Sequence, residues 1–158
     1  TIQGLWVSLT ASTAFVIITS AEKVNFGWIG VLGLLVWLTG FSIEVIADYQ
    51  KSNFKKDPAN KDRFINTGLW AWSRHPNYFG EIVLWTGILI IALPVLSGYR
   101  WFAVVSPVFV YFLLTRISGI PMLQKRANDR WGNDPEYQDY LRNTPKLIPW
   151  PSLAKKSV

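Results

Sequence analysis

The sequence has 158 residues, half of them hydrophobic, and its 16 Lys and Arg outnumber its 10 Asp and Glu. The charges are unevenly spread: residues 1–47 carry three, 48–81 carry ten, 82–115 carry one and 116–158 carry twelve. Two nearly uncharged blocks of this length exclude an ordinary soluble domain. The absence of Cys excludes disulfides, thiolate metal sites and Cys nucleophiles, and we expect no metal centre.

Uncharged stretches predict the membrane-spanning helices, because about 20 mostly apolar residues cross the hydrocarbon layer. Four stretches approach this length: Ile2–Ser20, Val24–Ile43, Ile82–Tyr99 and Trp101–Thr115, the last extending past Arg116 to Met122. Pro94 and Pro107 fall inside the last two, where a membrane helix tolerates a kink. The alternative is a soluble all-α protein, but four such segments leave too few amphipathic helices to cover them.

We therefore predict an all-α fold, an integral membrane helical bundle with about four transmembrane helices, a polar segment at 48–80 and an interfacial C-terminal helix. Residues 1–23 form the first transmembrane helix, 24–151 the main membrane domain and 152–158 a tail. The stretch Pro149–Pro151 is predicted to be interfacial or frayed. The chain begins at Thr1 without a basic leader, so we expect a fragment or a processed chain.

The first polar cluster follows the second predicted span. Glu44 and Asp48 are four residues apart and carry like charges near the membrane boundary, which is unfavourable unless cations or hydroxyl donors satisfy them. Such carboxylates are able to hold ribose hydroxyls or amide hydrogens of a ligand. Alternatively, Lys51, Lys55 and Arg74 neutralise them in a structural network.

The second cluster, Ser73–Glu81, leads directly into the third span. Pro76 disfavours helical geometry at His75 and suits a first helical turn, so we expect a helix to begin at Pro76. The N-terminus of that helix would face the polar side with unpaired N–H groups, which favours anions. Arg74 and His75 stand just before it. A cluster that meets lipid phosphates is the alternative.

The third cluster is basic and follows the fourth span. Arg116 interrupts an apolar run, where an ionisable residue is functional or reaches the interface. Lys125, Arg126 and Arg130 are spaced so that they share one helix flank. A phosphorylated cofactor needs such a cluster to compensate its charge. A solvated or lipid-facing basic face is the alternative.

Three motifs together resemble the C-terminal domain of the steroid 5-alpha-reductase superfamily, most closely its uncharacterised, mostly bacterial, membrane proteins. They are Arg74–Glu81 (RHPNYFGE) preceded by Thr67–Trp70, then Ser118–Leu123, and Pro135–Tyr137 leading to Arg142–Pro149. The resemblance covers roughly 27–151. It implies C-terminal helices that bind NADPH in an enzyme that reduces an activated carbon–carbon double bond of a lipid-like substrate.

By matching position, the resemblance implies that five residues contact the cofactor: Asp48, Lys55, Asn77, Glu81 and Arg116. With the clusters above, the candidate cofactor-binding residues are Asp48, Lys55, Arg74, His75, Asn77, Tyr78, Glu81, Arg116, Lys125 and Arg126. No catalytic residue is assigned, because the substrate-polarising Glu and Tyr of the reductases belong to N-terminal helices that we expect this chain to lack. Gln124 also departs from the family pattern, which has Glu at this position.

The hypothesis from the sequence is a membrane NADPH-dependent oxidoreductase, or its cofactor-binding part, acting on CH–CH bonds of a sterol, enoyl or isoprenoid-like lipid. The His-Pro-x-Tyr pattern more distantly resembles isoprenylcysteine carboxyl methyltransferases, so an S-adenosylmethionine-dependent membrane methyltransferase is one alternative. A non-catalytic scaffold subunit in contact with other membrane subunits is another. We expect membrane lipid and a lipid-like substrate as partners, and no nucleic acid.

The first testable prediction concerns orientation. Lys and Arg gather after the second span and in the C-terminal region, whereas the opposite connections carry only Lys23 and Arg100, so the polar segment and C-terminus should face the cytoplasm. Because the chain has no Cys, a single cysteine at Ser52 should react with an impermeant maleimide from the cytoplasmic side, and one at Ser97 from the opposite side. Equal accessibility at the two positions would refute this topology.

Overall fold

The computed structural model describes residues 2–20 and 27–151, and every regular element in these ranges is helical, as predicted. The α-helices are α1 (Ile2–Thr10), α2 (Ser12–Thr19), α3 (Trp28–Lys56), α4 (Pro76–Ala92), α5 (Val105–Phe112), α6 (Gly119–Trp131) and α7 (Pro135–Asn143). Short 3₁₀ segments cover Pro58–Asn60, Gly68–Ala71, Leu93–Val95 and Gly98–Val104, and a π-helical turn at Leu113–Ile117 joins α5 to α6.

Three helical stretches are long and apolar enough to cross a membrane: Trp28–Lys56, Pro76–Val95 and Gly98–Trp131. They correspond to the second, third and fourth predicted spans, although residues 24–26 of the second lie outside the described residues. The predicted count of four is not confirmed. The first predicted span, Ile2–Ser20, forms two short helices of nine and eight residues instead of one rod.

Polar side chains account for this break near Ala11. Ser12 donates a hydrogen bond to the carbonyl of Leu9 (2.9 Å), which competes with helical backbone pairing. Thr13 is fully buried and donates to the carbonyl of Ala103 (2.6 Å), while Ser106 donates to the carbonyl of Thr10. The two short helices are thereby attached to the segment that precedes and begins α5.

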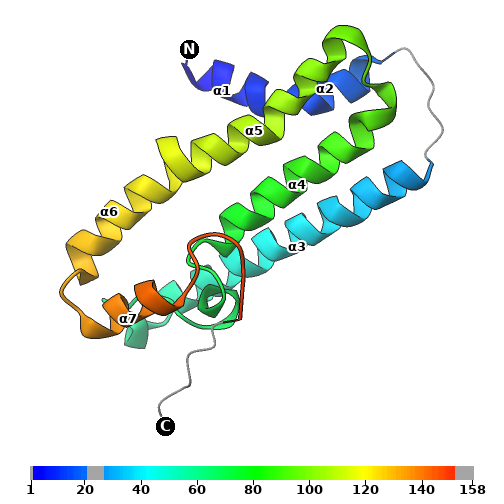
Figure 1. Cartoon of the computed structure of the whole chain (residues 1–158). Coiled ribbons are helices and arrows are strands. Elements are labelled where there is room, and N and C mark those ends of the chain that lie inside the picture. The colour runs from blue at the N-terminus through cyan, green and yellow to red at the C-terminus, as the bar shows by residue number, and fades with distance from the viewer. Residues whose placement is uncertain (1, 21–26, 152–158) are drawn as a thin grey trace.

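The long helices set the shape of the molecule (Figure 1). α3 and α4 lie side by side and antiparallel, and α5, the π turn and α6 form a third rod beside α4. α1 and α2 pack at the end where α4 connects to α5, and α7 lies at the opposite end, near the C-terminal end of α3. The polar clusters of the sequence all fall at the α7 end.

Helix α4 begins at Pro76, with His75 as the preceding cap residue, which confirms the predicted start. Its α-helical part ends at Ala92, earlier than the predicted Tyr99, because Pro94 lies in a 3₁₀ turn that closes the helix. Helix α3 in turn runs to Lys56, thirteen residues past the predicted end at Ile43. The Asp48–Lys55 block therefore lies on a helix.

Glycines bring α3 and α4 into backbone contact. A Cβ atom added at Gly40 of α3 would lie 2.4 Å from the backbone nitrogen of Leu84 and 2.6 Å from the carbonyl oxygen of Gly80 in α4. A Cβ added at Gly87 would lie 2.5 Å from the nitrogen of Trp37. Small residues at such a crossing let membrane helices approach closely, with van der Waals packing as the main attraction.

The chain after α7 is attached to the segment before α4 and is not frayed, contrary to the prediction. The backbone N–H of Trp150 donates to the carbonyl of Trp72 (3.0 Å), and that of Arg74 donates to the carbonyl of Pro145 (2.9 Å). Ser73 donates through its hydroxyl to the carbonyl of Leu147 (2.7 Å). We call residues 144–150 the strap. The tail predicted at 152–158 lies outside the described residues.

Gly40→Ala tests the backbone contact between α3 and α4. Because the added methyl group meets backbone atoms, the helices must separate, and we expect the free energy of unfolding to fall by about 1–3 kcal/mol. Ser42→Ala, at an exposed position of the same helix, is the matched control and should change it by less than about 0.5 kcal/mol. Thermal unfolding in detergent measures both. Equal stability of the two variants would show that α3 and α4 are not closely packed.

Candidate anion-binding pocket

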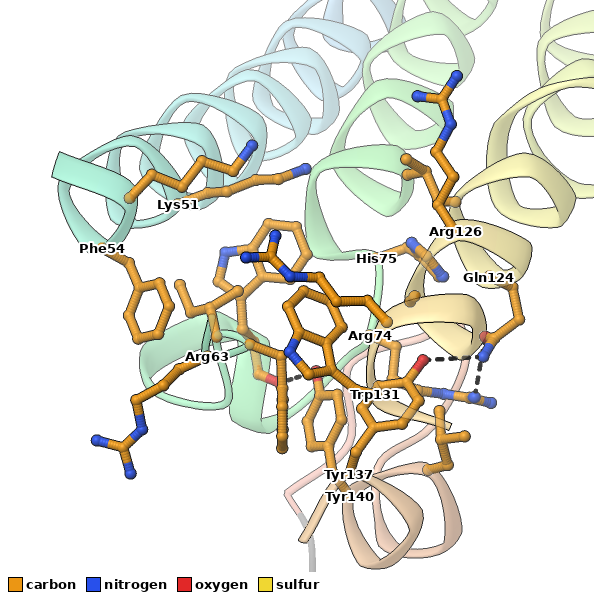
Figure 2. Close-up of a pocket in the computed structure, with 18 residues that line it drawn as sticks. Lys51, Phe54, Arg63, Arg74, His75, Gln124, Arg126, Trp131, Tyr137 and Tyr140 are labelled. Carbon is orange, nitrogen blue, oxygen red and sulfur yellow. Dashed lines mark hydrogen bonds between the residues drawn. The ribbon is translucent and has the colours of Figure 1, made fainter. Parts of the chain in front are cut away.

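A pocket of about 390 Å³ lies at the polar end of the bundle (Figure 2). It is enclosed by the end of α3, the segment 63–75, α6 and α7. Eighteen residues line it: Lys51, Phe54, Lys55, Arg63, Phe64, Ile65, Trp70, Arg74, His75, Leu123, Gln124, Arg126, Ala127, Arg130, Trp131, Tyr137, Tyr140 and Leu141. Its volume falls in the range of small-molecule sites.

Aromatic rings form one wall of this pocket. Phe64 lies at their centre, with ring centroids 5.1 Å from Tyr137, 5.3 Å from Tyr140 and 6.0 Å from Trp131. The polar atoms of these rings are bound elsewhere: Trp131 Nε1 donates to the carbonyl of Asp62 (2.6 Å), and the Tyr140 hydroxyl donates to the carbonyl of Trp70 (2.7 Å). The ring faces are therefore available as an apolar surface for a planar group.

Cations line the rest of the pocket. They are Lys51, Lys55, Arg63, Arg74, Arg126 and Arg130, and no Asp or Glu lines it. Arg130 forms an ion pair with Asp62, and its guanidinium lies 5.0 Å from the centroid of Trp131. The Lys51 ammonium lies 5.1 Å from the centroid of Trp70. This excess of positive charge favours an anionic ligand.

Arg74 and His75 present unsatisfied polar atoms to the pocket. His75 is 7% exposed, and neither of its ring nitrogens has a hydrogen-bond partner. The Nε atom of Arg74 is likewise buried without a partner, although its Nη1 donates to Gln124 (3.4 Å). Burial, together with the charges of Arg74, Lys51 and Lys146, lowers the pKa of His75 to about 4, so its imidazole is neutral at pH 7.

The backbone before α4 positions these two residues. The Ser73 hydroxyl accepts a hydrogen bond from the backbone N–H of His75 (3.1 Å) and donates to Leu147 of the strap. On the other side, the His75 ring stacks on Tyr78, with centroids 5.7 Å apart and an interplanar angle of 11°. The strap and the first turn of α4 thus fix the imidazole at the pocket wall.

A second polar group lies where α3 and α4 meet. The Asn77 side chain donates to the Asp48 carboxylate (3.1 Å), and Glu81 follows one helical turn after Asn77. The backbone of Glu44 also packs here, since a Cβ added at Gly80 would lie 2.7 Å from its nitrogen. This acidic corner is separate from the pocket lining, and Tyr78 links the two through its stack on His75.

The structure divides the ten predicted site residues into three sets. Lys55, Arg74, His75 and Arg126 line the pocket. Asp48, Asn77, Tyr78 and Glu81 form or flank the acidic corner. Arg116 and Lys125 are exposed and line neither, so the structure does not bring them to the pocket.

The aromatic wall was not predicted from the sequence, and Arg63 was not singled out. Arg63 and Phe64 precede Trp70 in the polar segment, and Trp131, Tyr137 and Tyr140 follow the basic cluster. The interleaving of aromatic and basic residues in both segments was the available signal. What the sequence does not show is that the two segments meet.

Fold and site together define a polytopic helical membrane protein with a cationic, aromatic-walled pocket at one end of its spans. The chain belongs to the family described as "Protein of unknown function (DUF1295)", whose model matches residues 1–144. That family is part of the steroid 5-alpha-reductase family, which confirms the resemblance inferred from the motifs.

Individual relatives are reductases by name. The chain is 28% identical over 125 residues to steroid 5-alpha-reductase DET2 of Gossypium hirsutum, covering 79% of this chain and 43% of that protein. It is 25% identical over 118 residues to 3-oxo-5-alpha-steroid 4-dehydrogenase 1 of Rattus norvegicus, covering 75% and 40%. It is 30% identical over 146 residues to Delta(14)-sterol reductase ERG24 of Saccharomyces cerevisiae, covering 83% and 31%. The chain thus spans less than half the length of these relatives, and no solved structure matches it.

The pKa of His75 generates a prediction for stability against pH. The unfolded chain takes up a proton on this imidazole near pH 6.5 and the folded chain only near pH 4, so the unfolded state binds more protons between these values. The free energy of unfolding should therefore fall as the pH is lowered, by about 3 kcal/mol at pH 4 from this group alone. The groups facing the imidazole are Arg74, Lys51, Lys146 and Tyr78.

His75→Phe isolates this contribution from that of the carboxylates, which also titrate in acid. The difference in unfolding free energy between the protein and this variant, followed from pH 7.5 to pH 4 in detergent, should change in favour of the variant. A constant difference across that range would show that His75 titrates normally in the folded protein.

Proposed function

We propose that the protein is an integral membrane reductase, or the cofactor-binding part of one, that uses NADPH to reduce an activated carbon–carbon double bond of a lipid-like substrate such as a sterol or enoyl lipid. The cationic pocket carries this proposal: six Lys and Arg side chains converge beside an aromatic wall, with no acidic residue in the lining. Membership of the steroid 5-alpha-reductase family and the names of the relatives support it.

The residues of the pocket fit a dinucleotide phosphate. The unpartnered Arg74 Nε and His75 nitrogens need hydrogen-bonding partners that the described protein does not supply. Lys55, Arg74 and Arg126 would hold phosphate oxygens through charge-assisted hydrogen bonds. The faces of Phe64 and Trp131 would support a planar base. When bound, NADPH would supply hydride to the substrate, while the protein supplies orientation and electrostatics.

The acidic corner suits the uncharged end of the same cofactor. The Asp48 carboxylate and the Asn77 amide offer acceptors and donors, and phosphate groups would be repelled from the carboxylates. Because this corner lies where α3 and α4 enter the membrane, a lipid-like substrate would reach it from the bilayer. In this arrangement the polar end of the bundle faces the cytoplasm, where Lys and Arg concentrate.

Calorimetry on the detergent-solubilised protein tests the cofactor class. NADPH should bind more tightly than NADH or S-adenosylmethionine, because only NADPH brings a 2′-phosphate as well as a pyrophosphate to the six cations. Its affinity should fall with rising salt, since exposed charges are screened over about 8 Å at 0.15 M. Arg126→Ala should weaken NADPH binding about 10-fold or more, as expected for loss of one charge-assisted contact.

Lys125→Ala is the matched control for this experiment, because Lys125 neighbours Arg126 on α6 but does not line the pocket. It should leave NADPH affinity within about twofold. Binding of S-adenosylmethionine with none of NADPH would replace the reductase by a methyltransferase. Binding of neither would favour the scaffold subunit, and equal losses in both variants would place the anion elsewhere.

A further inference from the structure

His75 is the one pocket residue whose side chain is almost fully buried yet satisfied by nothing in the described protein. Both ring nitrogens are buried without a partner, and only 7% of the residue is exposed. Buried polar groups in native proteins are nearly always paired, and those left unpaired require an explanation. An imidazole kept in this state at a pocket wall is one that a ligand satisfies.

The imidazole is not free to turn away and find a partner within the protein. Its backbone N–H donates to Ser73 Oγ at 3.1 Å, and Ser73 is itself fully buried and bound to Leu147. Its ring face lies against Tyr78 at 5.7 Å. Figure 2 shows the ring in the pocket wall with Arg74 and Arg126 labelled beside it. The edge that carries the nitrogens is thus held ready for the pocket.

The surroundings define what kind of group fits that edge. The imidazole is neutral at pH 7, so one nitrogen donates and the other accepts. Its charged neighbours, Arg74, Lys51 and Lys146, are donors only and provide no acceptor for the N–H. A phosphate dianion accepts but cannot donate, so it satisfies only one tautomeric form. A hydroxyl does both and matches a ring nitrogen in either state.

Arg74 adds the second requirement. Its Nε is buried without a partner directly beside the imidazole in sequence, and a guanidinium has donors only, in a geometry that matches phosphate oxygens. A ligand that satisfies both residues therefore carries an anionic phosphate and a hydroxyl close together. Vicinal phosphate and hydroxyl groups on one sugar ring meet this description.

We propose that Arg74 and His75 form a subsite for a phosphorylated ribose, in which the Arg74 guanidinium binds a phosphate oxygen and the His75 imidazole hydrogen-bonds the neighbouring ribose hydroxyl. This inference rests on the proposed function, since NADPH contains a ribose with a 2′-phosphate next to a 3′-hydroxyl. It goes further in assigning hydroxyl recognition to His75, so that His75 discriminates ribose from deoxyribose ligands.

The experiment pairs a change in the ligand with a change in the residue. The probes are adenosine 2′,5′-bisphosphate and its 3′-deoxy analogue, titrated by calorimetry into the detergent-solubilised chain. The unaltered protein should bind the bisphosphate about 10-fold more tightly than the analogue, as expected for one hydrogen bond to a buried group. His75→Phe keeps a planar ring for Tyr78 but has no nitrogens, so it should bind the two probes equally.

Stability without ligand distinguishes recognition from a structural role. Because Phe removes two unsatisfied buried nitrogens, His75→Phe should raise the melting temperature at pH 7.5 by about 2–8 °C while weakening the bisphosphate. A histidine that served only the fold would give the opposite change in stability. His75→Gln, which retains a donor and an acceptor, should preserve part of the discrimination between the probes.

Each outcome decides the matter separately from the reductase proposal. Equal binding of the two probes to the unaltered protein, or no binding of either, overturns the subsite even if NADPH binds. Discrimination that persists unchanged in His75→Phe also overturns it. Discrimination that is lost in His75→Phe supports the subsite even if NADPH itself fails to bind, in which case only the proposed reductase function falls.

Discussion

The close approach of α3 and α4 is the constraint on which the rest of the structure depends. Where Gly40 faces Gly80 and Leu84, the two backbones are so near that a single methyl group has no room. Lipid tails are as apolar as the side chains of these helices, so burial of apolar surface does not hold them together, and close packing does. That packing also fixes the register of the helices, and the register sets Asp48 beside Asn77 at their polar end.

Helix length turns this register into a site. With a rise of 1.5 Å per residue, the 29 residues of α3 span about 44 Å, and the helical stretch Gly98–Trp131 spans about 50 Å. Both exceed the hydrocarbon layer of about 30 Å, so each rod has polar turns to spare beyond it. Their polar ends carry Lys51 and Lys55 from one rod and Arg126 from the other toward the same space, which the segment 63–75 and α7 then close.

How much the sequence could predict follows from which forces act locally. Hydropathy located three spans because membrane burial depends on local composition, and Pro76 marked the start of α4 because its ring constrains its own turn. It missed the extension of α3 to Lys56, since a helix in water beyond the membrane needs no apolar residues. It also took Ile2–Ser20 as one span, although hydroxyls at Ser12 and Thr13 bind carbonyls and divide it.

The pocket depends on contacts that no local pattern contains. Phe64 meets Tyr137 and Tyr140 across more than 70 residues of chain, and Arg74 meets the strap at Pro145. Motif recognition found Arg74 and His75, because the family shares them, but it could not separate Arg126, which faces the pocket, from Lys125, which does not.

The charge of the pocket bears on how its parts stay together. Helix α7 is attached largely through side chains of the wall, such as the Tyr137 hydroxyl, which accepts from Gln124 (3.1 Å), and Tyr140, which donates to Trp70. Behind that wall the cations repel one another, and Asp62 offsets only Arg130. An anion in the pocket would relieve this repulsion and satisfy Arg74 at once. Since a ligand that binds only the folded state stabilises it, the wall, the strap and the ligand should act as one cooperative unit, whereas the glycine contact deeper in the membrane is independent of all three.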